Sequence, residues 1–186
     1  MVASMKTQTP QLSRDHWATH VNYPSQVLLL GSHENFRNVS RRLVDEARHP
    51  DRLTWVGHIY RRWISAMRSH EAYEERKLYP YLARRWGVSF AACEDGHETL
   101  HGRDDAVRAI LREVDAGGTG AELGERLATA LQRHDDVLVA HLEVEENAVI
   151  PLLLALSPAE FTRYSHNPLS VSLRDLETAE QARSDH

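Results

Sequence analysis

Two stretches of the sequence match each other in the types and positions of their polar residues. Both follow the pattern His-x3-Glu-Glu-x4-Pro, from His70 to Pro80 and from His141 to Pro151, at an offset of 71 residues. Residues four apart on an α-helix lie about 40° apart around its axis and one turn along it, so their side chains reach one space. Packing alone does not require the same polar residues twice. The repeat therefore favours a fold in which two helices present histidine and glutamate to a common site.

The repeat leaves open which glutamate of each pair shares the face of its histidine. Glu74 and Glu145 follow their histidines by four residues, whereas Glu75 and Glu146 follow them by five. On a regular helix the fifth residue points about 140° away from the first. We therefore expect Glu74 and Glu145 to face the site, with Glu75 and Glu146 as replacements if either helix is distorted.

The hydrophobic pattern is helical over most of the chain. Apolar residues recur at helical spacing in four segments, and no segment alternates as a strand would. An N-cap at Asp51 and a capping box from Thr119 to Glu122 are expected to open two of these helices. The predicted helices cover about 25–49, 51–86, 89–115 and 119–156. Long helices with short connections predict an all-α fold, an up-down-up-down four-helix bundle.

The segments before and after the bundle are more polar. The first is expected to be an irregular lead-in, and the last a short helix near 158–165, opened by a capping box from Ser157 to Glu160, with a polar tail. The predicted division is 1–24, 25–156 and 157–186. A chain of 186 residues has room for one domain with a proper core.

Composition excludes several classes of protein. A formal charge of −5 and the lack of a Lys/Arg block argue against nucleic-acid binding. The apolar run at 27–30 is too short to span a membrane, and no signal peptide precedes it. The single cysteine, Cys93, excludes an intramolecular disulfide and a thiolate metal cage. We expect a cytoplasmic protein without a membrane partner, either a monomer or a homodimer.

Further histidines lie on the other two predicted helices. Helix one carries His33, and helix three carries His97 and His101, another pair four residues apart. His33 lies 17 residues before Pro50 and His70 lies 20 after it, and the mismatch at the other two connections is smaller. Three residues of helix rise only about 5 Å. The four helices are therefore expected to bring their histidines and glutamates to one layer of the bundle.

A lone helical histidine is usually a surface or capping residue, and Glu-Glu pairs usually lie on solvated faces. The joint pattern instead favours a metal site, because imidazole and carboxylate side chains from facing helices form the di-iron sites of helical bundles. Whether His97 and His101 both bind the metal stays open. The predicted ligands are His33, His70, Glu74, His97, His101, His141 and Glu145.

Other residues near the repeats receive structural assignments. A proline within a helix costs about 3 kcal/mol and removes a backbone hydrogen bond. We expect Pro80 and Pro151 to bend the helices and splay one end of the bundle, without a catalytic role. Tyr73, Tyr79 and His58 are expected to be core or interface residues rather than donors to the site.

With these residues in order, the chain resembles the hemerythrin-like, or HHE cation-binding, family over about 25–156. The resemblance implies a non-haem centre of two iron ions (Fe2+/Fe3+), bridged by carboxylates and an oxo or hydroxo group, with a position open to a small molecule. In oxygen-carrying hemerythrins the last carboxylate follows its histidine by five residues, where Glu146 stands here. Glu145 and Glu74, each four residues after a histidine, resemble instead the bacterial di-iron repair proteins and iron-sensing domains.

The resemblance implies small-molecule redox chemistry or sensing. Its leading interpretation is a protective di-iron protein that reacts with H2O2, O2 or NO, with a catalase-like peroxide-decomposing activity. The alternatives are an iron- or oxygen-sensing module without turnover, a di-iron repair protein and an oxygenase. Imidazole and carboxylate ligands suit iron, with zinc and manganese as competitors.

Overall fold

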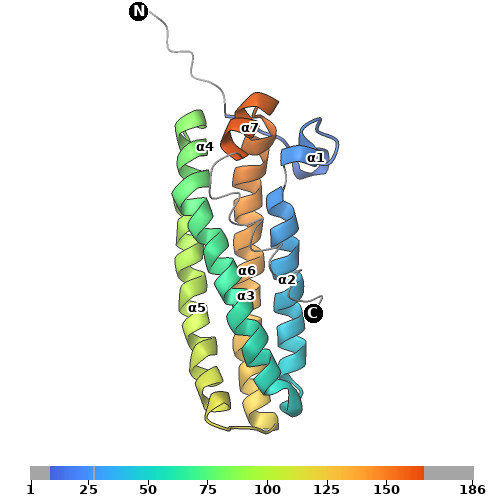
Figure 1. Cartoon of the computed structure of the whole chain (residues 1–186), viewed down its shortest axis with the longest axis vertical. Coiled ribbons are helices and arrows are strands. Elements are labelled where there is room, and N and C mark those ends of the chain that lie inside the picture. The colour runs from blue at the N-terminus through green and yellow to red at the C-terminus, as the bar shows by residue number, and fades with distance from the viewer. Residues whose placement is uncertain (1–8, 27, 166–186) are drawn as a thin grey trace, which may run out of the picture.

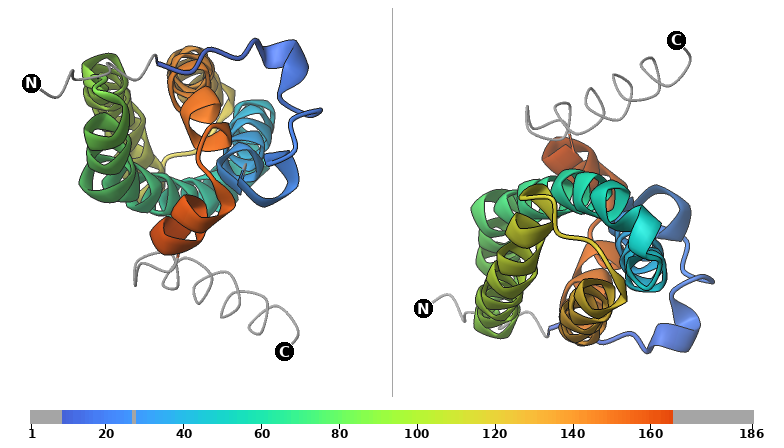
Figure 2. Two further views of the ribbon diagram at one scale, coloured as in Figure 1. Left: turned by 90° about the horizontal axis from the view of Figure 1, so that it is seen from above. Right: turned by 90° about the horizontal axis from the view of Figure 1, so that it is seen from below.

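The computed structural model describes residues 9–26 and 28–165, and this part of the chain contains helices and turns without a strand. Four long helical segments lie side by side, and successive segments run in alternating directions (Figure 1). Seen along their length, they surround a common interior (Figure 2). The segments are α2 (Leu28–Ala47), α3 (Leu53–Tyr73) with α4 (Tyr79–Trp86), α5 (Ala91–Asp115) and α6 (Ala121–Leu154). The predicted all-α helical bundle is confirmed.

The connections between the long helices are short, as the sequence predicted. A 3-10 turn, Pro50–Arg52, joins α2 to α3. Gly87 ends α4 with a φ of 71°, and its N–H donates to Ala83 O at 2.8 Å. Gly120 has a φ of 108° just before α6. Glycine adopts these positive φ values without the steric cost that a Cβ atom brings, so it allows tight turns at both places.

Several predicted helix starts are wrong in detail. Arg52, not Asp51, is the N-cap of α3, because the 3-10 turn over Pro50–Arg52 comes first. Gly120 is the N-cap of α6 and no side chain caps it, so the capping box predicted at Thr119 does not form. The first predicted helix corresponds to α1 (Tyr23–Gln26) and α2, with residue 27 between them outside the described residues.

The capping box predicted at Ser157 is confirmed. The Ser157 N–H donates to Glu160 Oε2 at 2.9 Å, and the Glu160 N–H donates to Ser157 Oγ at 3.3 Å. These reciprocal bonds satisfy two backbone donors at the start of α7 (Pro158–Ser165). The polar tail predicted after this helix lies outside the described residues.

The second predicted helix contains an irregular turn. Residues Glu74–Leu78 form a π-helical turn between α3 and α4, which we call the π segment. The Tyr79 N–H donates to the carbonyl of Glu74, five residues earlier. Pro80 follows this turn within α4, whereas Pro151 lies inside α6, which continues as one α-helix to Leu154. π-turns are frequent at functional sites.

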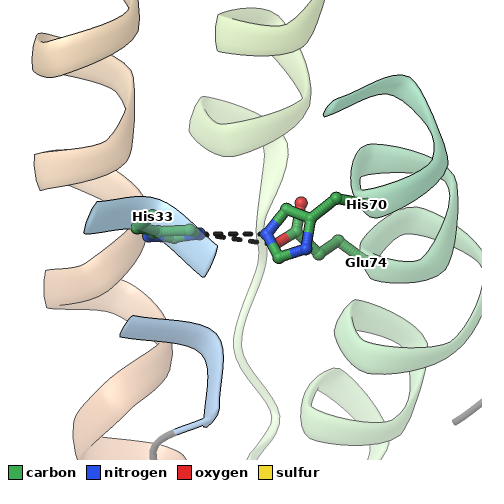
Figure 3. A group of neighbouring side chains, drawn as sticks. All are labelled: His33, His70 and Glu74. Atoms are coloured by element: carbon green, nitrogen blue, oxygen red, sulfur yellow. Dashed lines mark hydrogen bonds and ion pairs between the residues drawn. The ribbon is translucent and has the colours of Figure 1, made fainter. Parts of the chain in front are cut away.

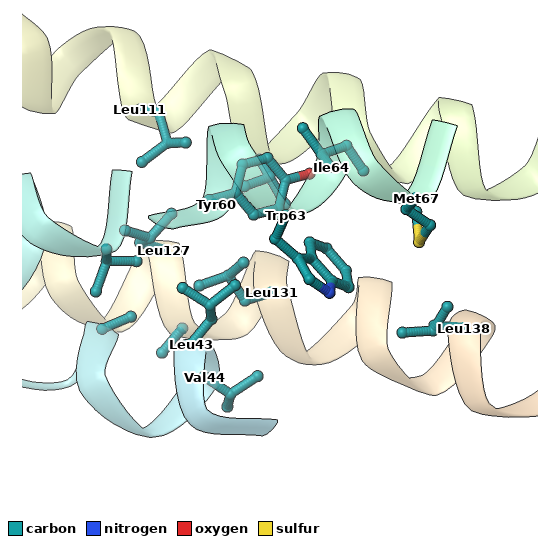
Figure 4. Packing of buried hydrophobic residues seen from close by; sticks show 14 of the residues in the cluster. Leu43, Val44, Tyr60, Trp63, Ile64, Met67, Leu111, Leu127, Leu131 and Leu138 are labelled. Atoms are coloured by element: carbon teal, nitrogen blue, oxygen red, sulfur yellow. The ribbon is translucent and has the colours of Figure 1, made fainter. Parts of the chain in front are cut away.

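The apolar interior of the described residues consists of two clusters. One fills the half of the bundle shown in Figure 4, with Tyr60, Trp63, Leu111 and Leu127 among its members. The other includes Leu78, Val149 and Ile150 from the opposite half. The histidines and glutamates singled out in the sequence lie along the helices between the two clusters.

The N-terminal segment docks on the end of α6. Trp17 is 4% exposed and belongs to the second cluster. Asn22 Nδ2 donates to the carbonyls of Leu154 and Leu156 at 2.9 and 3.0 Å, and Gln26 Nε2 donates to Leu153 O at 2.9 Å. These side chains satisfy carbonyl groups that the end of a helix leaves without a partner. Among the described helices, none has a stretch long and apolar enough to cross a membrane.

Candidate metal centre

Six of the seven predicted ligands lie together between the two apolar clusters. They form two groups of three buried residues, each drawn from two helices, and in each group one ligand atom per residue lies within 4.8 Å of the others. The first group is His33, His70 and Glu74, and the second is His97, His141 and Glu145. The repeat predicted this arrangement, because each group contains one His-x3-Glu pair and one histidine from a neighbouring helix.

The first group joins α2 to α3 and the π segment. His33 Nε2 lies 3.1 Å from His70 Nε2, and His70 Nε2 lies 2.8 Å from Glu74 Oε1. Figure 3 shows the His33 ring directed across the interior toward the other two side chains. His33 and Glu74 are 0% exposed and His70 is 8% exposed. The three side chains therefore direct their polar atoms at one point that is shielded from solvent.

Two carboxylates connect the first group to the second. Glu74 Oε2 lies 3.6 Å from His97 Nε2, while its other oxygen faces His33 and His70. Glu145 Oε2 lies 3.6 Å from both His33 Nε2 and His141 Nε2. Each glutamate thus lies between histidines of both groups.

The donor atoms of this site have unsatisfied hydrogen-bonding capacity. Among the described residues, Glu74 Oε2, His97 Nε2 and Glu145 Oε2 are buried without a hydrogen-bond partner. A buried polar atom without a partner costs free energy, which a bound cation would offset. Neutral imidazole nitrogens and carboxylate oxygens are ligands for iron, zinc and manganese. The residues present fit a pair of such ions.

In the metal-free site the pKa values of the two central glutamates shift in opposite directions. Burial alone would raise the pKa of Glu74, but the charge of His70 and hydrogen bonds to the surrounding histidines lower it well below its usual range. Burial and the neighbouring Glu74 carboxylate raise the pKa of Glu145 well above its usual range. Burial lowers the pKa of His141 to about 4, so its ring is neutral at pH 7. Metal ions compete with protons for these atoms, so metal binding here is expected to release protons.

The second glutamate of each repeat lies within hydrogen-bond distance of the Nδ1 atom of a histidine from another helix. Glu146 Oε1 lies 3.2 Å from His33 Nδ1, and Glu75 Oε1 lies 2.8 Å from His97 Nδ1. A carboxylate at Nδ1 fixes the ring orientation and leaves the Nε2 lone pair free for a metal. In the structure Glu74 and Glu145 belong to the two groups, and Glu75 and Glu146 contact the Nδ1 side of a histidine; which glutamates bind a metal stays a prediction.

Glu146 is itself held by two arginines that the sequence did not identify. Arg37 Nη1 lies 2.7 Å from Glu146 Oε1, and Arg14 forms an ion pair with Glu146 Oε2. Burial alone would raise the pKa of Glu146, but His33 and Arg37 outweigh it and lower the pKa to about 2. Arg37 stands one helical turn after His33, a spacing that was visible in the sequence. Arg14 comes from a segment whose position no pattern predicts.

The match to a known family agrees with this geometry. Residues 27–153 match the model of the hemerythrin HHE cation binding domain. The chain belongs to the hemerythrin HHE family. No curated protein and no solved structure matches the chain. The family match covers α2 through nearly all of α6, and therefore every residue of the two groups.

One predicted ligand of this HHE domain lies outside the site. His101 is 45% exposed at its side chain, and its Nε2 lies 2.8 Å from Glu71 Oε2. The i,i+4 spacing from His97 brings it to the same side of α5, but its ring pairs with the buried Glu71 carboxylate rather than with the two groups. The structure therefore brings His97, but not His101, into the two groups, and a role of His101 as a ligand stays a prediction.

Tyr79 of the HHE domain contributes to the site, contrary to expectation. Its hydroxyl donates to Glu145 Oε1 at 2.7 Å, while its ring stacks on Phe90 at 4.7 Å between centroids. Tyr79 is only 2% exposed, so it is a core residue and a donor at once. Tyr73 does lie at an interface, where its hydroxyl pairs with that of Tyr164, and His58 is exposed.

Gly96 allows α5 to approach His141 closely in this HHE domain. A Cβ atom at position 96 would lie 2.2 Å from His141 Nδ1, closer than real Cβ atoms approach other atoms. The absence of a side chain lets the imidazole of His141 lie against α5, 4.7 Å from the His97 ring between centroids. The sequence did not predict this role, because a glycine within a helical segment does not show which residue of another helix packs against it.

Proposed function

We propose that the two groups hold two iron ions bridged by Glu74 and Glu145, and that this centre reacts with H2O2, O2 or NO. The observation that carries the proposal is the pair of carboxylates that each reach histidines of both groups. Membership of a cation-binding family supports a metal, and the mixture of imidazole and carboxylate ligands supports iron.

We further propose that H2O2 is decomposed, two molecules giving two of water and one of O2. Iron supplies the electron transfer for such a reaction when it is bound. The protein side chains set the conditions. The sites are buried and separate the chemistry from bulk water, while Glu75 and Glu146 hold the Nδ1 sides of His97 and His33. The Tyr79 hydroxyl fixes the orientation of Glu145. Packed helices around the site favour small reactants.

Anaerobic loading with Fe(II), followed by H2O2, tests this function. We expect two irons per chain, a change in the absorption spectrum on addition of H2O2, and release of O2. His70→Ala and His141→Ala should each lower the iron content well below that of the unaltered protein. His58→Ala, at an exposed histidine, is the control and should load normally.

Two results would contradict the proposal. Unchanged iron loading in both His70→Ala and His141→Ala would remove the site assignment. Tight binding of zinc, with no spectral response of the iron-treated protein to H2O2, would remove the redox function while leaving a metal site in place.

A second function, sensing without turnover, is favoured by one contact. Arg14 in the N-terminal segment pairs with Glu146, which hydrogen-bonds His33. Iron binding at His33 would then change the position of the N-terminal segment through Glu146 and Arg14. This alternative predicts a change in amide exchange around residues 12–17 on iron removal, together with no O2 release from H2O2.

A further inference from the structure

A pocket of about 290 Å³ lies on the bundle outside the metal centre. The π segment and α4 form one wall, and α7 forms the other. Both walls lie at the same end of the bundle (Figure 1). The lining residues are Arg76, Lys77, Pro80, Tyr81, Arg84, Arg163 and Tyr164.

The pocket concentrates positive charge in a chain whose formal charge is −5. Four of its seven lining residues are cationic and none is acidic. Glu160, a carboxylate of the same helix α7, accepts hydrogen bonds from Arg85 at 2.8 Å and from the Ser157 N–H at 2.9 Å. It is therefore engaged by groups that do not line the pocket.

The cations of the pocket lack acidic partners in the part of the chain that the structure describes. Arg76, Lys77 and Arg84 form no ion pair there, and Arg163 donates to a backbone carbonyl, Ala159 O, at 3.2 Å. Several exposed arginines elsewhere on the bundle do have such partners, as Arg126 does with Glu113 at 2.6 Å. Like charges gathered without a counterion repel one another, and a bound anion removes that repulsion.

Two tyrosine rings lie beside these charges. Tyr81 and Tyr164 stack with their centroids 5.0 Å apart and their planes inclined by 28°. Tyrosine faces provide flat contact area for an aromatic group, and guanidinium groups bind phosphate through paired N–H donors. The combination matches a ligand that carries both a phosphate and an aromatic base.

We propose that this pocket binds a phosphate-bearing small molecule of the mononucleotide class. Pockets for small ligands usually measure about 300–1,000 Å³, and 290 Å³ lies at the lower end of that scale, which favours a ligand no larger than a mononucleotide. Arg76, Lys77, Arg84 and Arg163 engage the phosphate, and Tyr81 and Tyr164 contact the base. The assignment does not depend on the iron chemistry, because none of the lining residues belongs to the two metal-binding groups.

Isothermal titration of the full chain with AMP, inorganic phosphate and adenosine tests the assignment. AMP is expected to bind more tightly than phosphate, and adenosine least tightly. The double variant Arg84→Gln/Arg163→Gln should weaken AMP binding about tenfold or more, since hydrogen bonds to charged groups are lost. Arg112→Gln/Arg133→Gln, at exposed arginines of α5 and α6, is the matched control and should bind AMP as the unaltered protein does.

A second variant separates the phosphate from the base. Tyr81→Leu should weaken AMP binding and leave phosphate binding unchanged. Equal affinities for AMP and phosphate would overturn the nucleotide assignment, and adenosine binding as tightly as AMP would overturn the role of the cations. Failure of both AMP and phosphate to bind at millimolar concentration, with iron loading intact, would overturn the pocket proposal alone.

Discussion

Single side chains that do not face the metal decide how the ligands are held. Glu75 and Glu146 hydrogen-bond the Nδ1 atoms of His97 and His33. The Tyr79 hydroxyl donates to Glu145 Oε1. Gly96 leaves space for the His141 ring. The His-x3-Glu pairs of the two groups could be predicted from i,i+4 spacing, because that spacing is local, whereas His33 was predicted from its height in the bundle. The supporting contacts could not, since His33 and Glu146 are 113 residues apart and their contact depends on the packed bundle.

Replacing Gly96 with alanine is expected to lower the iron content. The added Cβ atom displaces the His141 ring from its place against α5. Gly102→Ala is a matched control on the same helix, because nothing lies within 4 Å of its Cβ position. Alanine there should stabilise the protein by about 0.5–1 kcal/mol through helix propensity. Metal analysis and urea unfolding of both variants check the prediction, and equal iron in the two would contradict it.

Replacing Tyr79 with phenylalanine tests the hydrogen bond to Glu145. The variant keeps the stacked ring but leaves Glu145 Oε1 without its donor. Outer partners of metal ligands usually contribute a factor of about 10–100 in metal affinity, and a loss of this size is expected. Competition with a chelator measures it. Tyr81→Phe, whose hydroxyl has no hydrogen bond recorded among the described residues, should bind iron normally.

The observed helices cover nearly the same residues as the predicted ones, but their first residues and their regularity differ. The glycines after Asp115 predicted the end of the helix that corresponds to α5, and α5 does end at Asp115. The sequence pattern did not predict the π segment, because His70 to Pro80 and His141 to Pro151 carry the same pattern and only the first contains the irregular turn. The local pattern therefore predicted a helix, and the packing around it determined whether its turns are α- or π-helical.

The two predicted capping boxes allow a direct comparison between helix ends. Ser157→Ala removes an observed cap of α7, and a cap of this kind contributes about 1 kcal/mol. Amide exchange over α7 should become faster. Thr119→Ala removes a side chain that does not cap α6, so exchange at the start of α6 should not change. Hydrogen exchange followed by mass spectrometry distinguishes the two, and equal effects would contradict the assignment.

The bundle as a unit carries a buried histidine that makes it sensitive to acid. His134 is 1% exposed, lies against Tyr60 and Trp63, and has no partner for either ring nitrogen among the described residues. Burial lowers its pKa from 6.5 to about 4. Between these values the unfolded chain binds the proton and the folded protein does not. Stability is therefore fully present above pH 6.5 and is lost as the pH falls toward 4.

Replacing His134 with leucine should remove this part of the acid sensitivity. The loss of unfolding free energy between pH 7 and pH 4 should be smaller in the variant, by up to about 3 kcal/mol. Urea unfolding of the metal-free protein across this range measures it. His58→Gln, at an exposed histidine, should retain the dependence of the unaltered protein. Parallel curves for His134→Leu and the unaltered protein would contradict the prediction.

At the level of the complete bundle, the number of residues between each turn and the nearest histidine or glutamate predicts that these side chains share one layer. The count works because helices rise by a constant amount per residue and the connections are short. It could not show that His101 turns to Glu71, or that the N-terminal segment reaches the site through Arg14. Those outcomes depend on competition between charged partners, which spacing does not encode.

The layer of histidines and glutamates separates the two apolar clusters, and this has a consequence for cooperativity. A continuous core transmits the loss of packing at one end to the other, so that a small domain opens as one unit. Here the metal-free layer lies between two bodies of apolar contact. Each body is expected to open as a separate cooperative unit. Metal ions bound by residues of four helices at this level would couple the two units, so that the bundle unfolds in a single cooperative transition.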